Sequence, residues 1–325
     1  MTSYKSKRYH NRCGYGIIDD VLNWVYPISI YGYWGGGATS SIAEVATTDR
    51  IVFSTQITSV NTISNLSQAR YGLAGISDTE NYGYFSGGYT DTYVSTSDRI
   101  LFSNGVTSAN TISNLLVSTY WFGSVSDHAN YGYFAGGEAG GPRTANAYYL
   151  TFSNGIISSS TVSNLSQARH TLGALSDAFL FGYFAGGYTG NVTNLTDQIT
   201  FSSKITSAKT IANLSSNREH LTGLSDNKEY GYFSGGNGYT AQTDQITFST
   251  QSTISKTTAN LSLARDFCSG ISDGLNYGYV GGGNNGSVSS VTDQINFSSQ
   301  TTVAKTTANL SLAREMLAGL SDSTV

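Results

Sequence analysis

The chain has 325 residues, of which 12% are charged, and its formal net charge is −4. This balance argues against nucleic acid as a partner, because proteins that bind nucleic acid present a basic surface. No apolar run approaches the ~20 residues of a membrane-spanning helix, so we expect no membrane insertion. The 37 Gly and 23 Tyr, against two Pro, favour short strands joined by tight turns.

The first segment, residues 1–26, lies outside any repeat. It holds four basic residues and then a short apolar set, without the apolar core of a secretory signal. We expect an arm that packs on the following domain or docks onto another protein. The two cysteines, Cys13 and Cys268, make no disulfide framework, which suits assembly in a reducing cytosol.

The chain from residue 27 to 325 is repetitive. Residues 82–88 read Tyr-Gly-Tyr-Phe-Ser-Gly-Gly, and the chain carries five near-copies. The copies lie at 31–37, 131–137, 181–187, 230–236 and 277–283. A period of about 50 residues is typical of a repeat architecture, in which each unit buries its apolar faces against its neighbours.

Each unit predicts four strands. A first run such as 70–78 ends in Ser-Asp, and the Tyr-Gly element follows as the second. The third run alternates apolar and polar residues, as at Ile100 and Phe102, which is the strand period of two. The fourth run is rich in Thr and Ser and ends in Asn-Leu-Ser, as at 62–67. We interpret the repeated Ser-Asp and Asn-Leu-Ser sequences as structural turns.

The first run of each unit carries small residues near its end, such as Ala74-Gly75 and Thr222-Gly223. Small side chains at one level in six copies indicate crowding around a common axis. We therefore place the first run innermost and the polar fourth run at the outer edge, where Ser and Thr limit edge-to-edge pairing.

The two ends of the chain are out of phase. The chain ends with a first run at 314–322, and the repeats begin with a second run at 28–37. Joined, these runs complete one unit. The sequence therefore predicts an all-β fold, a six-bladed β-propeller of four-stranded blades, closed by the C-terminal strand pairing with the N-terminal strands.

The order Ala-Arg-x-Gly-Leu-Ala-Gly, Gly-Tyr-Phe-x-Gly-Gly and Ile-x-Phe resembles the kelch repeat over roughly residues 27–325. The third strand has Phe where kelch usually has Tyr, and the kelch Trp of the fourth strand is absent. The polar, Gly- and Tyr-rich texture is also similar to kelch-like repeat proteins of tailed phages, cyanophages in particular. That resemblance implies a fibre or virion-surface protein.

Arginines open five first strands, and aspartates open five third strands. In an up-and-down sheet these strands start at the same end, about 10 Å apart. The remaining unit has Thr119 and Tyr148 at the two positions, so both partners are missing together. We predict intrablade ion pairs, with a ring of Arg that grips an anion as the alternative. The pairs are Arg70 with Asp98, Arg169 with Asp197, Arg218 with Asp244, Arg265 with Asp293 and Arg314 with Asp49.

Signatures of catalysis are weak. The four histidines have no metal-binding spacing, although His170 and His220 follow the Arg positions of adjacent units and can meet at the channel mouth. Cys268 has no histidine nearby in its unit, which argues against copper chemistry of the galactose oxidase type, and the sialidase Asp box is absent. No phosphate-binding loop occurs. We expect no enzyme, metal or cofactor.

The loops between second and third strands vary most, at 89–97, 138–147, 188–196, 237–243 and 284–292. A constant scaffold with divergent loops is a common design of binding surfaces. Aromatic faces beside polar groups suit sugar rings or protein partners. The candidate binding residues are Tyr89, Tyr93, Tyr120, Trp121, Arg143, Tyr148, Tyr149, Tyr188 and Tyr239; packing within Tyr-rich strands is the other interpretation.

These observations favour a non-enzymatic recognition or structural module, located on a phage virion or tail fibre. It would contact a host-surface glycan or a neighbouring virion protein, with residues 1–26 as its attachment to the particle. Two alternatives stay open. One is a cytoplasmic kelch-type scaffold for a protein partner, and the other is a glycan-acting enzyme with its site at the propeller axis.

Overall fold

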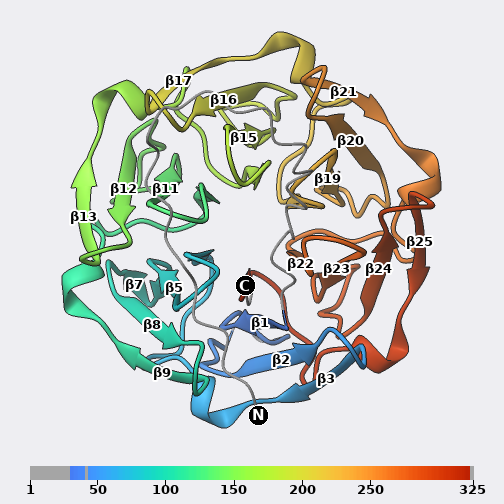
Figure 1. Cartoon of the computed structure of the whole chain (residues 1–325), viewed down its shortest axis with the longest axis horizontal. Helices are drawn as coiled ribbons and strands as arrows, with labels where there is room; N and C mark the ends of the chain where they lie inside the picture. Colours follow the sequence, from blue (N-terminus) through green and yellow to red (C-terminus); the bar gives the residue numbers. More distant parts are fainter. Residues whose placement is uncertain (1–29, 41–42, 323–325) are drawn as a thin grey trace, which may run out of the picture.

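The computed structural model describes residues 30–40 and 43–322, and the arm predicted at 1–26 lies outside this range. Six sheets stand around a central axis like the blades of a propeller (Figure 1). Each sheet has four antiparallel strands in radial order from the axis to the rim. The predicted all-β class, the number of blades and the number of strands per blade are confirmed.

The blades are numbered I to VI from the N-terminus. Blade I comprises β26 (Ala318–Ser321), β1 (Tyr31–Gly35), β2 (Thr48–Val52) and β3 (Ile57–Val60). Blade II comprises β4 (Ala74–Ser77), β5 (Tyr82–Ser86), β8 (Ser97–Leu101) and β9 (Val106–Ala109). Blade III comprises β10 (Gly123–Ser126), β11 (Tyr131–Ala135), β12 (Ala147–Thr151) and β13 (Ile156–Ser159).

Blade IV comprises β14 (Gly173–Ser176), β15 (Phe181–Ala185), β16 (Thr196–Thr200) and β17 (Ile205–Ala208). Blade V comprises β18 (Thr222–Ser225), β19 (Tyr230–Ser234), β20 (Thr243–Thr247) and β21 (Ser252–Ser255). Blade VI comprises β22 (Ser269–Ser272), β23 (Tyr277–Gly281), β24 (Thr292–Asn296) and β25 (Thr301–Ala304). The loop after β5 adds a small hairpin, β6 (Tyr89–Thr90) with β7 (Thr92–Tyr93).

A short 3-10 turn follows each outer strand. The fourth strand predicted at 62–67 is therefore wrong in its position, because the outer strand of blade I is β3 and residues 62–64 form the turn. The turns are η1 (Thr62–Ser64), η2 (Thr111–Ser113), η3 (Thr161–Ser163), η4 (Thr210–Ala212), η5 (Thr257–Ala259) and η6 (Thr306–Ala308). The asparagine that ends each turn is a structural residue. In blade I the Asn65 side chain accepts a hydrogen bond from the Thr48 amide at 2.9 Å. The same bond recurs in the other five blades.

The glycine of each Tyr-Gly-Tyr element lets neighbouring blades pack closely. A Cβ at Gly83 would lie 2.8 Å from Leu320, which projects from the inner strand of the preceding blade. A Cβ at Gly132 would lie 2.2 Å from Ile76 for the same reason. The flanking Tyr84 and Phe85 are fully buried, because the second strand is covered on both faces.

The inner strands surround a channel of about 270 Å³. The small residues predicted at the axis are needed there, since a Cβ at Gly223 would lie 2.2 Å from the Ala174 carbonyl oxygen. Serine hydroxyls tie adjacent blades together near one end of the channel. Ser225 Oγ donates to the Ser176 carbonyl at 2.7 Å, and Ser272 Oγ donates to the Ser225 carbonyl at 2.6 Å.

The two ends of the repeat array meet in blade I. β26 pairs antiparallel with β1, with Gly32 opposite Ser321 and Gly35 opposite Ala318. The Asp322 carboxylate also accepts hydrogen bonds from the amides of residues 30 and 31, at 2.9 and 2.7 Å. The predicted closure of the ring by the C-terminal strand is confirmed.

Candidate functional site

In five of the six blades, the arginine that precedes the inner strand is buried inside its own blade. The ion-pair distances for the five predicted pairs are 2.6–3.0 Å, and each pair joins residues of one blade. Exposure of each side chain is 3% or less. An anion-gripping ring of guanidinium groups is therefore excluded, because none of these five groups reaches solvent.

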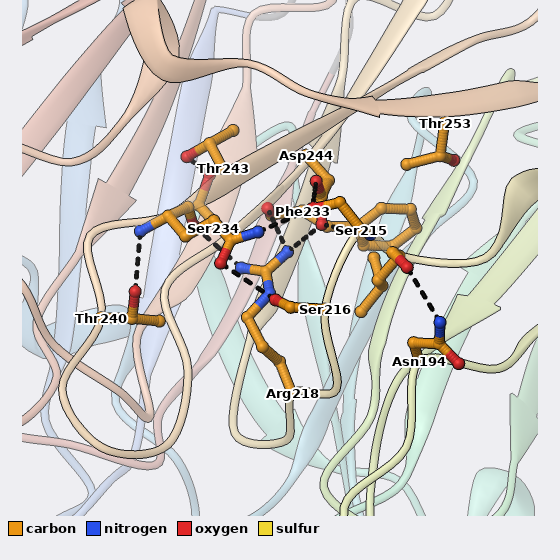
Figure 2. Close-up of polar contacts among 12 residues, drawn as sticks. Asn194, Ser215, Ser216, Arg218, Phe233, Ser234, Thr240, Thr243, Asp244 and Thr253 are labelled. Carbon is orange, nitrogen blue, oxygen red and sulfur yellow. Dashed lines mark hydrogen bonds and ion pairs between the residues drawn. The ribbon is translucent and has the colours of Figure 1, made fainter.

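Blade V shows how one such arginine fixes the end of a blade (Figure 2). Arg218 Nη2 lies 2.6 Å from Asp244 Oδ2, and Arg218 Nη1 donates to the carbonyls of Gly235 and Gln242 at 2.8 Å. Asp244 in turn accepts hydrogen bonds from Ser215. The guanidinium thus joins the inner strand, the second strand and the variable loop, which holds the loop end of the blade in place.

Two residues beyond each arginine position, the backbone forms a closed ring around the axis. Each of the six residues donates its amide to the carbonyl of the residue in the preceding blade, at 2.8–3.0 Å. All six have φ between 51° and 65°. The residues are Gly72, Trp121, Thr171, His220, Phe267 and Met316. This ring sets one mouth of the channel and directs five different side chains to it, since Gly72 has none.

Aromatic side chains from three blades meet at this mouth, around a depression of about 80 Å³. Trp121 and Phe267 come from blades on opposite sides of the axis, and their ring centroids are 6.2 Å apart. His220 stacks on Phe267 at 3.8 Å. Gly72 makes room for this arrangement, since a Cβ there would lie 2.9 Å from the Trp121 ring.

The mouth is surrounded by two different half-circles. Blades II to IV contribute a chain of ring contacts, which we call the aromatic half. Successive centroid distances along it are 5.4, 5.6, 4.2, 5.6 and 5.4 Å. Its members, in order, are Tyr71, Tyr89, Tyr120, Trp121, His170 and Tyr188.

Polar groups border the aromatic half. Tyr93, on the β6–β7 hairpin, contacts both Tyr89 and Tyr120, and its hydroxyl donates to Glu138 at 2.7 Å. The hydrogen bond to Glu138 raises the pKa of Tyr93 to about 12. Arg143, from the loop of blade III, lies over the Tyr188 ring at 5.3 Å. The resulting surface offers ring faces with hydroxyl, carboxylate and guanidinium groups beside them.

Blades V, VI and I contribute carboxylates, and we call Glu219, Asp266 and Glu315 the acidic half. His220 lies between two of them, with Nε2 3.6 Å from Glu219 and Nδ1 3.7 Å from Asp266. Asn284 donates from its side chain to Glu315 at 2.8 Å. Burial raises the pKa of Glu315, and the Asp266 charge adds to this effect.

The structure separates the nine sequence candidates into three groups. It brings Tyr89, Tyr93, Tyr120, Trp121, Tyr188 and Arg143 together at the mouth. Tyr148 instead lies in the hydrophobic core, and Tyr149 packs on Tyr131 under Lys204. Packing within the blade is the correct interpretation for Tyr148, and Tyr149 is half-buried in these contacts. Tyr239 is 46% exposed on the loop of blade V.

Sequence reasoning missed Phe267, Asp266, Glu219 and Glu315 as mouth residues. His170 and His220 do approach one another there, as both contact Trp121. A usable signal was present, because all of these residues occupy the first or second position after the arginine in their unit. Comparing these two positions across six copies would have identified the missed residues.

Residues 30–40 and 43–322 contain no group of three or more His, Cys, Asp or Glu side chains arranged to hold a metal ion. No helix in the same residues is long and apolar enough to cross a bilayer.

Fold and mouth together define the class of protein: a six-bladed β-propeller whose axial channel opens beneath a mixed aromatic and acidic face. No protein-family model matches the chain, and no curated protein matches it either. The kelch-like and phage resemblances therefore stay predictions.

Proposed function

We propose that this propeller is a non-enzymatic recognition module that binds a glycan on its mouth face. The observation that carries the proposal is the aromatic half, an unbroken series of ring contacts across three adjacent blades. Tyr89, Trp121 and Tyr188 are neither fully buried nor isolated. Partly exposed ring faces next to hydrogen-bonding groups suit the apolar faces and hydroxyls of sugars.

The direct test is binding of the purified chain to a panel of neutral glycans, followed by titration calorimetry on any glycan retained. Trp121→Ala and Tyr93→Ala should each weaken binding by about ten-fold, equivalent to ~1.4 kcal/mol. Tyr239→Ala is the matched control, because Tyr239 is exposed on a loop of blade V outside the aromatic half. Absence of binding to every glycan, or equal losses in all three variants, contradicts the proposal.

The enzymatic alternative has a specific observation in its favour, since His220 lies between two carboxylates at the mouth. Incubation with retained glycans separates the two functions. A recognition module leaves the glycan intact, whereas a hydrolase releases new reducing ends. Release that is abolished by Asp266→Asn would replace the recognition proposal with the enzymatic one.

We further propose that the module is displayed on a phage virion, with residues 1–26 docked onto another particle protein. This placement rests on the resemblance of the repeats to kelch-like phage proteins. Mass spectrometry of purified particles tests it directly. Detection of the chain only in the soluble fraction of the host would favour the cytoplasmic scaffold, and capture of a host protein partner would then be the next test.

A further inference from the structure

The acidic half carries a more specific inference, which rests on the proposed glycan binding. We propose that the mouth selects an amino sugar, a ligand with a saturated ring face and a protonated amine. The aromatic half would receive the ring face, and the acidic half would receive the amine.

The first support is a group of three carboxylates at the mouth, two of which lie beside His220. Glu219, Asp266 and Glu315 come from three consecutive blades and face the same mouth. Within the residues that the structure describes, no lysine or arginine forms an ion pair with any of them. The neighbouring guanidinium groups are bound to Asp49, Asp244 and Asp293 inside the blades. A cationic group at the mouth would be attracted to these carboxylates.

The second support is an unsatisfied buried acceptor. Asp266 is 7% exposed, and its Oδ1 atom has no hydrogen-bond partner within the described residues. Its other oxygen faces His220 Nδ1, which also lacks a hydrogen bond. A buried carboxylate oxygen without a donor is costly, so a donor supplied by a ligand is favoured. An ammonium group offers three such donors.

The third support is the aromatic surface beside these carboxylates. Phe267 adjoins Asp266 in the chain, stacks on His220 and lies beside Trp121. A cation over such rings is attracted by their electron-rich faces. Carboxylate and aromatic groups together therefore favour a cationic ligand and disfavour an acidic one. Arg143 borders the aromatic half, where it lies over the Tyr188 ring.

The experiment compares two probes of equal length by titration calorimetry at pH 6.5 and low salt. One is a β-1,4-linked glucosamine oligosaccharide with free amines, and the other is its fully N-acetylated counterpart. The native protein should prefer the free amine by at least ten-fold. The Asp266→Asn, Glu315→Gln double variant should reduce that preference to three-fold or less. Glu80→Gln is the control, because Glu80 lies in an exposed turn between inner and second strands, at the other end of its blade.

The outcomes keep the two proposals apart. Equal affinity for both probes, lost on Trp121→Ala, overturns the amine preference and leaves glycan binding standing. Amine binding that depends on Asp266 but is unaffected by Trp121→Ala supports the charge recognition and contradicts the aromatic glycan site. A lysine-rich peptide that competes more tightly than the amino sugar overturns the assignment to a sugar.

Discussion

Each of the five buried arginines forms an ion pair with an aspartate and also donates to a backbone carbonyl, as Arg169 shows. Arg169 Nη1 lies 2.7 Å from Asp197, while Nη2 donates to the Phe184 carbonyl at 3.0 Å. Asp197 also accepts the Ser166 amide at 3.1 Å. Burial lowers the pKa of Arg169, and the Asp197 charge opposes that shift. The carboxylate therefore offsets the free-energy cost of burying a charged guanidinium.

Removing one partner should be far more costly than removing both. We expect Asp197→Ala to lower the free energy of unfolding by about 3–5 kcal/mol, because it leaves Arg169 charged and buried. Denaturant unfolding monitored by tryptophan fluorescence measures this loss.

Blade III supplies the control, since it has Thr119 and Tyr148 at the equivalent positions. The double variant Arg169→Thr, Asp197→Tyr places the Thr and Tyr of blade III at the equivalent positions of blade IV. It should be less destabilised than Asp197→Ala. A loss below ~1 kcal/mol for Asp197→Ala would mean that the pair contributes little to stability.

At the scale of elements, the turns between inner and second strands are built on one carboxylate each. Asp78 Oδ1 accepts the amides of Glu80, Asn81 and Tyr82 at 3.1, 2.7 and 2.7 Å. Burial raises the pKa of Asp78, and these amides oppose the shift. In blade I the same contact joins chain segments at opposite ends of the array, through Asp322. Burial raises the pKa of Asp322 to about 6.

This pKa has a consequence for stability. Asp322 has a folded-state pKa of about 6, above the ordinary aspartate value of 3.8. The native state therefore binds more protons than the unfolded state across this interval. The Asp322 contribution to stability is fully present below about pH 4 and is lost as pH rises through 6, a change of about 3 kcal/mol.

Asp322→Asn removes this titration and keeps an acceptor oxygen. Relative to the native protein, the variant should gain stability between pH 4 and pH 7, as measured by urea unfolding at each pH. Buried carboxylates such as Asp78 titrate in both proteins and cancel in the difference. A difference that does not change with pH would show that the two amide donors fully offset burial.

At the scale of the molecule, the ring depends on its last strand. β26 contributes Ala318 and Leu320 to one hydrophobic cluster, and Leu317, the residue just before β26, belongs to another. Arg314, which pairs with Asp49, also precedes this strand. Without these residues β1 becomes an open inner edge and Asp49 loses its partner. The mouth would also lose Glu315 and Met316, and with Met316 one link of the backbone ring.

Truncation after Ala313 should lower the melting temperature by at least ~10 °C, because the lost burial and ion pair exceed ~5 kcal/mol. Differential scanning calorimetry measures the change. Deletion of residues 323–325 is the control, since it retains β26 and Asp322. Equal melting temperatures for the two truncated chains would contradict closure by this strand.

The architecture could be predicted from the amino-acid sequence: six units, four strands per unit, the Arg–Asp pairing and the meeting of the chain ends. These features recur in up to six copies, so an interpretation of one copy can be tested on the others. The Arg and the Asp are missing together in one unit, at Thr119 and Tyr148, which indicated that the two residues contact each other. Strand periodicity and turn residues are local, and local signals are readable without coordinates.

The contacts among residues that occur in a single copy could not be predicted without the three-dimensional structure. Trp121, His220 and Phe267 lie in three different units, and they meet because the backbone ring points their side chains at one axis. The register of β12 turns Tyr148 into the core, whereas Tyr149 is half-buried against Tyr131 and Lys204. The division into aromatic and acidic halves likewise depends on the order of blades around the ring.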